Sequence, residues 1–273
     1  MGGLLKCCLE LFNPSEEPEM RKNNSQTGRL KLLSKSKSPI NEIKREEISE
    51  TKFLYYFEIE EEDKENIIKM LPYELEVIHV KEIDSTMPAS RQYIDEGNKL
   101  PFIYNTIIQT AGVGKGDRKW YGNIEGNLYT SSCIPTSMVL NEISSKDILV
   151  KLTAISIIQI LVKYSNEFFL KYPNDIICKD KKKMGGIIAE NYKDFWIIGF
   201  GINIVDKPDP DEEKIRKGGL PPCCIKDHLP ELNAKLQALE LSIDVTTQII
   251  YNLKYNNTEN KINQMFGKYV LNN

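Results

Sequence analysis

The chain has 273 residues, of which 41% are hydrophobic, and it carries a formal net charge of −3. This length suits one large domain or two small ones, and the near-neutral charge excludes a general affinity for nucleic acid. No stretch approaches the roughly 18–20 apolar residues that a membrane-spanning helix needs.

The cysteines and histidines show neither a disulfide pattern nor a local metal motif. The six cysteines form two doublets and two single positions, with no CxxC spacing: Cys7, Cys8, Cys133, Cys178, Cys223 and Cys224. This arrangement is typical of a reduced, cytoplasmic protein. The only histidines, His79 and His228, lie far apart in the sequence, so no metal site of ordinary His/Cys spacing is predicted.

The N-terminal part of the chain differs in composition from the rest. Residues 13–52 are rich in Asn, Ser, Lys, Glu and Pro and show no sustained hydrophobic period. Such segments bury too little apolar surface to fold alone. We therefore expect residues 1–52 to be disordered and residues 53–273 to form the folded domain.

The first predicted elements are a strand at Glu74–Val80 and a helix at Pro88–Glu96. Thr86 or Met87 lies near the helix cap, Pro88 occupies the first turn, and Gly97 ends the helix. In the motif Asp84–Ser85–Thr86, the two hydroxyls could be helix caps with no further role, or they could face a ligand. A second strand is predicted at Phe102–Gln109, where Gln109 could equally be a satisfied polar group of the core.

A loop that is rich in glycine and basic residues follows this strand. Gly112, Gly114 and Gly116 alternate with other residues, and Lys115, Arg118 and Lys119 add positive charge. Alternate glycines let backbone N–H groups turn toward an anion. The spacing is not that of a P-loop, and the loop leads into a strand, which excludes a dinucleotide fold. A mobile surface loop is the alternative, but Trp120 at its end could pack over a flat base once the loop closes.

The second half of the chain predicts a sheet with helices packed on it. We expect strands at 128–134, 168–172 and 195–205, a buried helix at 147–164 capped by Ser144 or Ser145, a proline-rich loop at 206–228, and a helix at 245–255 with a further one from about 261. Strands outnumber helices, and several are neighbours in sequence. The fold class is therefore α+β, with a mixed, largely antiparallel sheet flanked by helices.

Two motifs are predicted to face each other on a hairpin. Lys171–Tyr172–Pro173–Asn174–Asp175 precedes one strand, and Lys183–Met184–Gly185–Gly186 begins the next. Pairing of the strands brings Asp175 and Lys183 close together. A carboxylate, ammonium groups and a glycine pair on a rigid frame suit the handling of a phosphate-bearing anion. The alternative, a solvated hairpin tip, fits Lys179, Lys181 and Lys182.

Taken together, these motifs resemble the catalytic domain of biotin protein ligases, the family of biotin–[carboxylase] ligases and holocarboxylase synthetases. The likeness covers roughly residues 77–204. It depends on four blocks in order: Asp84–Ser85–Thr86, Gln109–Gly112 through Arg118–Trp120, Lys171–Asp175 with Lys183–Ile187, and Gly199–Ile204. The resemblance implies a fold similar to the catalytic core of class II aminoacyl-tRNA synthetases.

The resemblance also implies roles for the motif residues. Catalysis would fall to Lys183, Asp175 and Lys115. Biotin would contact Ser85, Thr86, Gln109, Gly112, Val113, Gly114, Lys115, Lys183 and Gly186. The nucleotide would contact Arg118, Trp120, Asn174, Lys183 and Asn203. The implied activity joins biotin to a carrier-domain lysine of a carboxylase, such as acetyl-CoA or pyruvate carboxylase, through biotinyl-5′-AMP, with ATP and Mg²⁺.

The sequence also departs from the family pattern. Val113 and Lys115 stand where the family loop has arginines, and a lysine lacks the bidentate fork of arginine, so we expect weaker retention of the adenylate. A small C-terminal β-barrel domain and a DNA-binding helix-turn-helix are not expected. A lipoate or octanoate ligase of the same fold, and a biotin-binding module without activity, are the alternatives. The chain could act as a monomer or a homodimer.

Overall fold

The computed structural model describes residues 40–49, 51–62, 68–116, 118–209, 215, 219–228 and 234–271. The chain divides into two compact units, Met1–Ile78 and His79–Asn273. In the first unit, β1 (Ile40–Ser49), β2 (Lys52–Glu62) and β3 (Ile68–Ile83) pair antiparallel in that order, and β3 continues into the second unit.

The strands of the first unit differ from the sequence prediction. Residues 40–49 were expected to be disordered but form β1, and β3 begins six residues before the predicted Glu74. The local sequence has no hydrophobic period, but contacts between paired strands stabilise the sheet. The Arg45 guanidinium lies 4.2 Å from the centre of the Phe53 ring, and Lys52 pairs with Glu76 at 2.8 Å. The predicted disorder of residues 1–39 concerns residues outside the described ranges, and the assignment of 53–273 as one catalytic domain stays a prediction.

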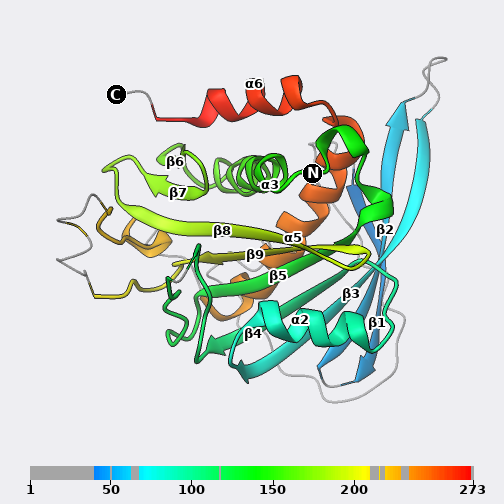
Figure 1. Cartoon of the computed structure of the whole chain (residues 1–273), viewed down its shortest axis with the longest axis horizontal. Coiled ribbons are helices and arrows are strands. Elements are labelled where there is room, and N and C mark those ends of the chain that lie inside the picture. The colour runs from blue at the N-terminus through cyan, green and yellow to red at the C-terminus, as the bar shows by residue number, and fades with distance from the viewer. Residues whose placement is uncertain are drawn as a thin grey trace, which may run out of the picture. The chain divides into compact units, whose positions relative to one another are not determined.

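The second unit is built on an antiparallel arrangement of six strands (Figure 1). Their spatial order is β4 (Phe102–Gln109), β5 (Leu128–Pro135), β9 (Phe195–Ile202), β8 (Lys183–Tyr192), β7 (Asp175–Cys178) and β6 (Phe168–Lys171). Each neighbouring pair in this order is antiparallel, and isolated parallel bridges join Leu170 to Val270 and Lys183 to Pro222. The predicted α+β class with a largely antiparallel sheet is confirmed.

Helices cover both faces of this sheet. On one face, α2 (Thr86–Asp95) packs on β4, β5 and β9. On the other, α5 (Ala234–Tyr255) packs on β4 and β5, and α3 (Lys146–Leu161) packs on β8 and on α6 (Glu259–Tyr269). Adjacent serines of β5 mark the two faces, because successive side chains of a strand point in opposite directions. Ser131 Oγ donates to Thr86 Oγ1 of α2 at 2.8 Å, whereas Ser132 Oγ lies 2.5 Å from Thr246 Oγ1 of α5.

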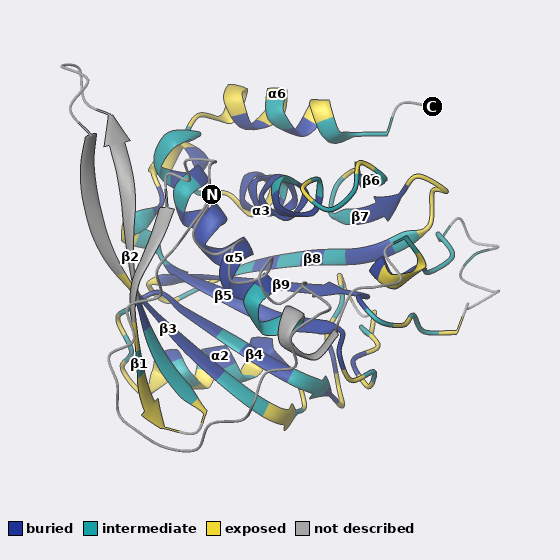
Figure 2. Ribbon diagram, turned by 180° about the vertical axis from the view of Figure 1, so that it is seen from behind, coloured by how far each residue is buried: buried dark blue, intermediate teal, exposed yellow. Residues whose placement is uncertain are grey.

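The core lies between strands β5 and β9 and the helices that pack on them. Every residue of β9 is buried, and so is every residue of β5 before Pro135, because helices cover both sides (Figure 2). Helix α3 is apolar around most of its circumference, which is typical of a helix enclosed by other elements. Short 3₁₀ turns lie at η1 (Thr136–Met138), η2 (Asn141–Ile143) and η3 (Ile225–Asp227).

Most of the predicted elements of this unit are confirmed within a few residues. Ser145 caps α3 by accepting a hydrogen bond from the Ile148 N–H at 3.3 Å. Helix α5 is the main difference, since it begins at Ala234 and not near Val245. Its first half is rich in Ala, Leu, Lys, Gln and Glu, which favour a helix, so a local signal for it was present. In the described part of the chain, no helix combines the length and apolar character needed to cross a membrane.

Candidate active site

A pocket opens beside the ends of β4, β8 and β9 in the second unit. Its walls come from the start of α2, the loop after β4, the β7–β8 hairpin and the segment before η3. Its lining includes Ser85, Thr86, Met87, Gln109, Val113, Gly114, Lys115, Arg118, Lys119, Trp120, Tyr121, Asn174, Lys183, Gly186, Gly199, Gly201, Asn203, Asp209 and Pro222. Residues far apart in the sequence thus share one cavity.

One end of the pocket is a buried polar cluster around the start of α2. The Gln109 side-chain oxygen accepts a hydrogen bond from the Thr86 N–H at 2.8 Å, and Thr86 Oγ1 accepts from Ser131 at the same distance. Ser85 is the N-cap residue of α2, but its side chain makes no capping hydrogen bond. A capping role therefore does not explain the Ser85 hydroxyl, which lies against the pocket. This end offers amide and hydroxyl groups to a neutral polar ligand.

The loop after β4 is a narrow hairpin. The Gln109 N–H donates to the Gly122 carbonyl at 2.7 Å, and the Trp120 N–H donates to the Gly112 carbonyl at 2.8 Å. The Gly114 N–H likewise donates to the Arg118 carbonyl at 2.7 Å. At Gly114 the N–H therefore bonds within the hairpin, whereas the sequence predicted glycine N–H groups that face an anion.

Close approach of the two arms explains the glycines better. A Cβ at Gly112 would lie 2.5 Å from the Trp120 carbonyl oxygen, and one at Gly114 would lie 2.9 Å from that of Arg118. Gly116 has a φ of +66°, a conformation that favours glycine. The basic residues Lys115, Arg118 and Lys119 are exposed on this hairpin, where they could reach an anion.

The indole of Trp120 lies on a floor made of glycines. A Cβ at Gly201 would come within 2.4 Å of the indole Cε2, and one at Gly186 would lie 3.1 Å from Cζ3. The indole Nε1 is buried without a hydrogen-bond partner. Two strands thus leave a flat space that only an aromatic side chain or another planar group can fill. The close approach predicted for the Gly185–Gly186 pair is explained at Gly186 by Trp120.

Lys183 and Asp175 form an ion pair beside the Trp120 indole. Lys183 Nζ lies 2.5 Å from Asp175 Oδ1, and the two side chains are 29% and 20% exposed. The ammonium also lies 5.7 Å from the centre of the Trp120 ring. The predicted proximity of Asp175 and Lys183 is confirmed. Asp175 does not line the pocket, so it would act on a ligand by orienting Lys183.

Two asparagines of the pocket are held by the backbone. Asn174 Nδ2 donates to the Ile187 carbonyl, and Asn203 Nδ2 donates to the Cys223 carbonyl, both at 3.0 Å. These bonds fix the orientation of each amide. Fixed polar groups bind a ligand without losing further side-chain entropy.

The structure brings nearly all predicted site residues to one pocket. Gly112 and Asp175 are the exceptions, since each supports a lining residue and does not line the pocket itself. Sequence reasoning assigned no role to Gly199 and Gly201, although a signal was present. Glycines two residues apart on a strand face the same side and mark a place where another group approaches. At Gly199 this group is Met87, whose Sδ would lie 2.7 Å from an added Cβ.

Comparisons with solved structures show what this arrangement is similar to. No family model matches the chain. A biotin protein ligase from Leishmania major in complex with biotinyl-5-AMP aligns at 22% identity and a TM-score of 0.60, covering 71% of this chain and 81% of that one. A biotin protein ligase from Aquifex aeolicus in complex with biotin and ATP aligns at 27% identity and a TM-score of 0.56, covering 71% and 78%.

A third structure agrees with these two. The biotin acetyl coenzyme A carboxylase synthetase from Helicobacter pylori, with bound biotinylated ATP, aligns at 17% identity and a TM-score of 0.54, covering 70% of this chain and 79% of that one. At 17% and 22% identity, the Helicobacter pylori and Leishmania major structures support the fold alone. The resemblance predicted from the four motif blocks is therefore confirmed: this chain is similar to the biotin protein ligases, a family of enzymes, over most of their length.

Proposed function

We propose that the chain joins biotin to a lysine of carboxylase biotin-carrier domains, using ATP and passing through biotinyl-5′-AMP. The observation that carries this proposal is the combination of two environments in one pocket. A buried amide and hydroxyl cluster at Thr86 and Gln109 suits a neutral ring with polar groups. A lysine beside an aromatic residue on a glycine floor suits an acyl-adenylate.

The first chemical step would join two anions. A carboxylate oxygen of biotin attacks the α-phosphorus of ATP, a new C–O–P linkage forms, and pyrophosphate leaves. The Lys183 ammonium lines the pocket beside Trp120, where it can neutralise the oxygens that gain charge in the transition state. Losing one such donor costs about 2.7–4 kcal/mol of transition-state stabilisation.

The second step transfers the biotinyl group. The amine of the acceptor lysine attacks the acyl carbon, the C–N bond forms, AMP leaves, and the amine loses a proton. A free lysine has a pKa of about 10.4, so its proton must be removed near the site. The structure favours an orienting role for Asp175 through Lys183, and we keep its role as proton acceptor as a secondary proposal.

Other residues would bind the nucleotide. Trp120 would stack on the adenine, and Lys115 and Arg118 would reach the phosphates from the hairpin. Mg²⁺, when bound with ATP, neutralises phosphate oxygens. Asp209 offers a carboxylate at the pocket wall, which is the oxygen donor that Mg²⁺ prefers. The four described cysteines are free thiols, which supports our proposal of a cytoplasmic location.

One experiment tests this function. The purified chain is incubated with ATP, Mg²⁺, an apo carrier domain and either biotin or lipoate, and the carrier is weighed by mass spectrometry. We expect addition of one biotinyl group to the carrier lysine, with one pyrophosphate released per group. Transfer of lipoate alone would assign the chain to lipoate ligation. Binding of biotin without pyrophosphate release would show a binding module without activity.

A further inference from the structure

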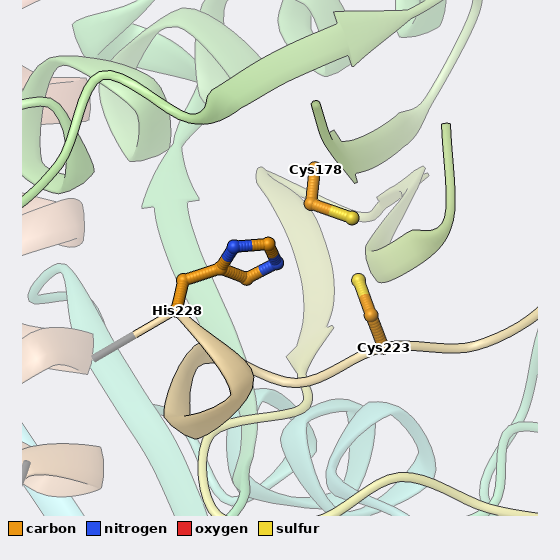
Figure 3. Close-up of side chains that lie close together, drawn as sticks. All are labelled: Cys178, Cys223 and His228. Carbon is orange, nitrogen blue, oxygen red and sulfur yellow. The ribbon is translucent and has the colours of Figure 1, made fainter. Parts of the chain in front are cut away.

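Three potential metal ligands converge behind the backbone of Lys183. Cys178 ends β7, Cys223 lies just before η3, and His228 directly follows η3. The two sulfur atoms and one imidazole nitrogen all lie within 4.8 Å of one another. Both thiols are buried, and the His228 side chain is only 11% exposed. Figure 3 shows the edge of the imidazole directed toward the two sulfurs.

No sequence motif indicates this cluster, because its ligands come from separate segments. The β7–β8 turn supplies Cys178, whose N–H donates to the Lys182 carbonyl at 3.0 Å. The segment with Cys223 runs beside β8, where the Cys223 N–H donates to the Lys183 carbonyl at 2.9 Å. Tertiary pairing therefore creates a ligand set that has no spacing motif. The sequence prediction concerned metal sites of ordinary His/Cys spacing, and this cluster has no such spacing.

The histidine is oriented as a metal ligand would be. His228 Nδ1 lies 2.9 Å from Glu167 Oε2. In the neutral tautomer that donates its Nδ1 proton to this carboxylate, the Nε2 lone pair is free to bind a metal ion. A carboxylate on the outer nitrogen is the usual arrangement behind a ligating histidine. The imidazole also packs edge-on against Phe168, with ring centres 5.7 Å apart. Its orientation is thus fixed from two sides.

We propose that Cys178, Cys223 and His228 form a Cys₂His site for a zinc-type divalent ion. Two thiolates and an imidazole are the donors that zinc prefers, and a tetrahedral ion places such donors about 3.5–3.8 Å apart. The cluster reaches this spacing if the side chains move inward by about 1 Å. Water can complete the fourth position. This inference does not depend on the proposed ligase activity.

Metal binding at this place would fasten the wall of the pocket. The segment that carries Cys223 also holds the Lys183 backbone and the Asn203 side chain. The Lys183 N–H donates to the Pro221 carbonyl at 2.7 Å, and Asn203 Nδ2 donates to the Cys223 carbonyl. An ion shared by β7 and this segment would join the two sides of Lys183. Its loss would loosen the segment without removing a residue that contacts the substrate.

The test uses Co²⁺ as a spectroscopic probe on the full chain, fully reduced and freed of metal with a chelator. We expect thiolate-to-cobalt charge-transfer absorption that saturates at one equivalent and disappears when Zn²⁺ is added. Cys178→Ser, Cys223→Ser and His228→Gln should each weaken binding by more than about 100-fold, and Glu167→Gln by about 10- to 100-fold. Cys224→Ser is the matched control, because Cys224 is an equally buried neighbour whose sulfur lies outside the cluster.

Thermal unfolding gives a second readout that does not depend on the spectrum. Zn²⁺ should raise the unfolding midpoint of the wild type and of Cys224→Ser, but not that of Cys178→Ser, because a ligand stabilises only the state that binds it. Far-UV circular dichroism checks that each variant folds. The proposal is overturned if reduced wild type shows no charge-transfer band, if the band survives in Cys178→Ser, or if the thiols of Cys178 and Cys223 persist as a disulfide after isolation.

Discussion

Replacing Gly201 by alanine tests whether the glycine floor exists to hold Trp120. The new methyl group would lie 2.4 Å from Cε2 and Nε1 of the indole. Carbon atoms in contact are normally about 3.5–4.0 Å apart, so the ring must move by at least about 1 Å. Overpacking of this kind costs about 1–3 kcal/mol of unfolding free energy. If the indole also stacks on adenine, its displacement costs about 1–3 kcal/mol of nucleotide binding.

The assay is a double-mutant cycle with Trp120→Ala. Gly201→Ala alone should raise the KM for ATP by about 5- to 150-fold, the range that corresponds to the stacking energy. In the Trp120→Ala background the same substitution should change the KM by less than about twofold, since the clash has been removed. Urea denaturation of the four proteins should show the same coupling in the unfolding free energy. Gly267→Ala is the control, because a Cβ there meets nothing within 4 Å.

Two outcomes would refute this reasoning. Equal effects of Gly201→Ala with and without Trp120 would show that the methyl group disturbs the strand and not the indole. If Gly201→Ala lowers the unfolding free energy by about 1–3 kcal/mol, as expected, but leaves the KM for ATP unchanged, Trp120 is packed there for structural reasons alone.

Three further predictions concern the polar cluster, the pH dependence and the ion pair. Gln109→Leu removes the acceptor of the buried Thr86 N–H and should lower the unfolding free energy by about 1–3 kcal/mol. Gln109→Glu keeps an acceptor and should lower the unfolding free energy by less, and chemical denaturation compares the two variants. Burial lowers the pKa of His79 below 6.5, so on acidification the unfolded state binds a proton at a higher pH than the folded state does. The unfolding free energy should therefore fall as the pH drops from 6.5 toward the folded-state pKa. His79→Gln should flatten this part of the stability–pH curve, and an unchanged slope would show that His79 is not the group responsible. Asp175→Asn removes the charge that pairs with Lys183 and should slow adenylate formation by about 10- to 150-fold, which corresponds to a charged hydrogen bond of about 1.5–3 kcal/mol. Stopped-flow detection of pyrophosphate release measures this rate. An unchanged rate would show that Asp175 does not orient the ammonium.

The sequence allowed prediction of those elements whose signals are local. The strand at 102–109 is rich in aromatic and β-branched residues, which favour a strand. Ser145 lies just before the apolar run of α3 and indicates where that helix begins. The pairing of Asp175 with Lys183 followed from hairpin geometry, because a short turn leaves few registers for two strands. Local rules were sufficient for each of these features.

Features set by tertiary contacts were missed. The charged residues of β1 read as a polar tail until its pairing with β2 is known. The first half of α5 is a different case, because its Ala, Leu, Lys, Gln and Glu residues favour a helix and this local signal was overlooked. The glycine spacing indicated a close approach at Gly201, but not which group approaches, because the Trp120 ring comes from a loop about eighty positions earlier in the chain. The Cys178 and His228 cluster was hidden for the same reason.

The most direct test of the central claim is the rate of biotinyl-AMP formation by Lys183→Met in a single turnover. Methionine keeps the length and apolar stem of lysine but removes the charge. We predict a fall of about 10²- to 10³-fold, the cost of losing one donor to the developing oxyanion. Lys182→Met, which removes a neighbouring exposed charge, should leave the rate unchanged. If Lys183→Met forms the adenylate as fast as the wild type, the account of this pocket is wrong.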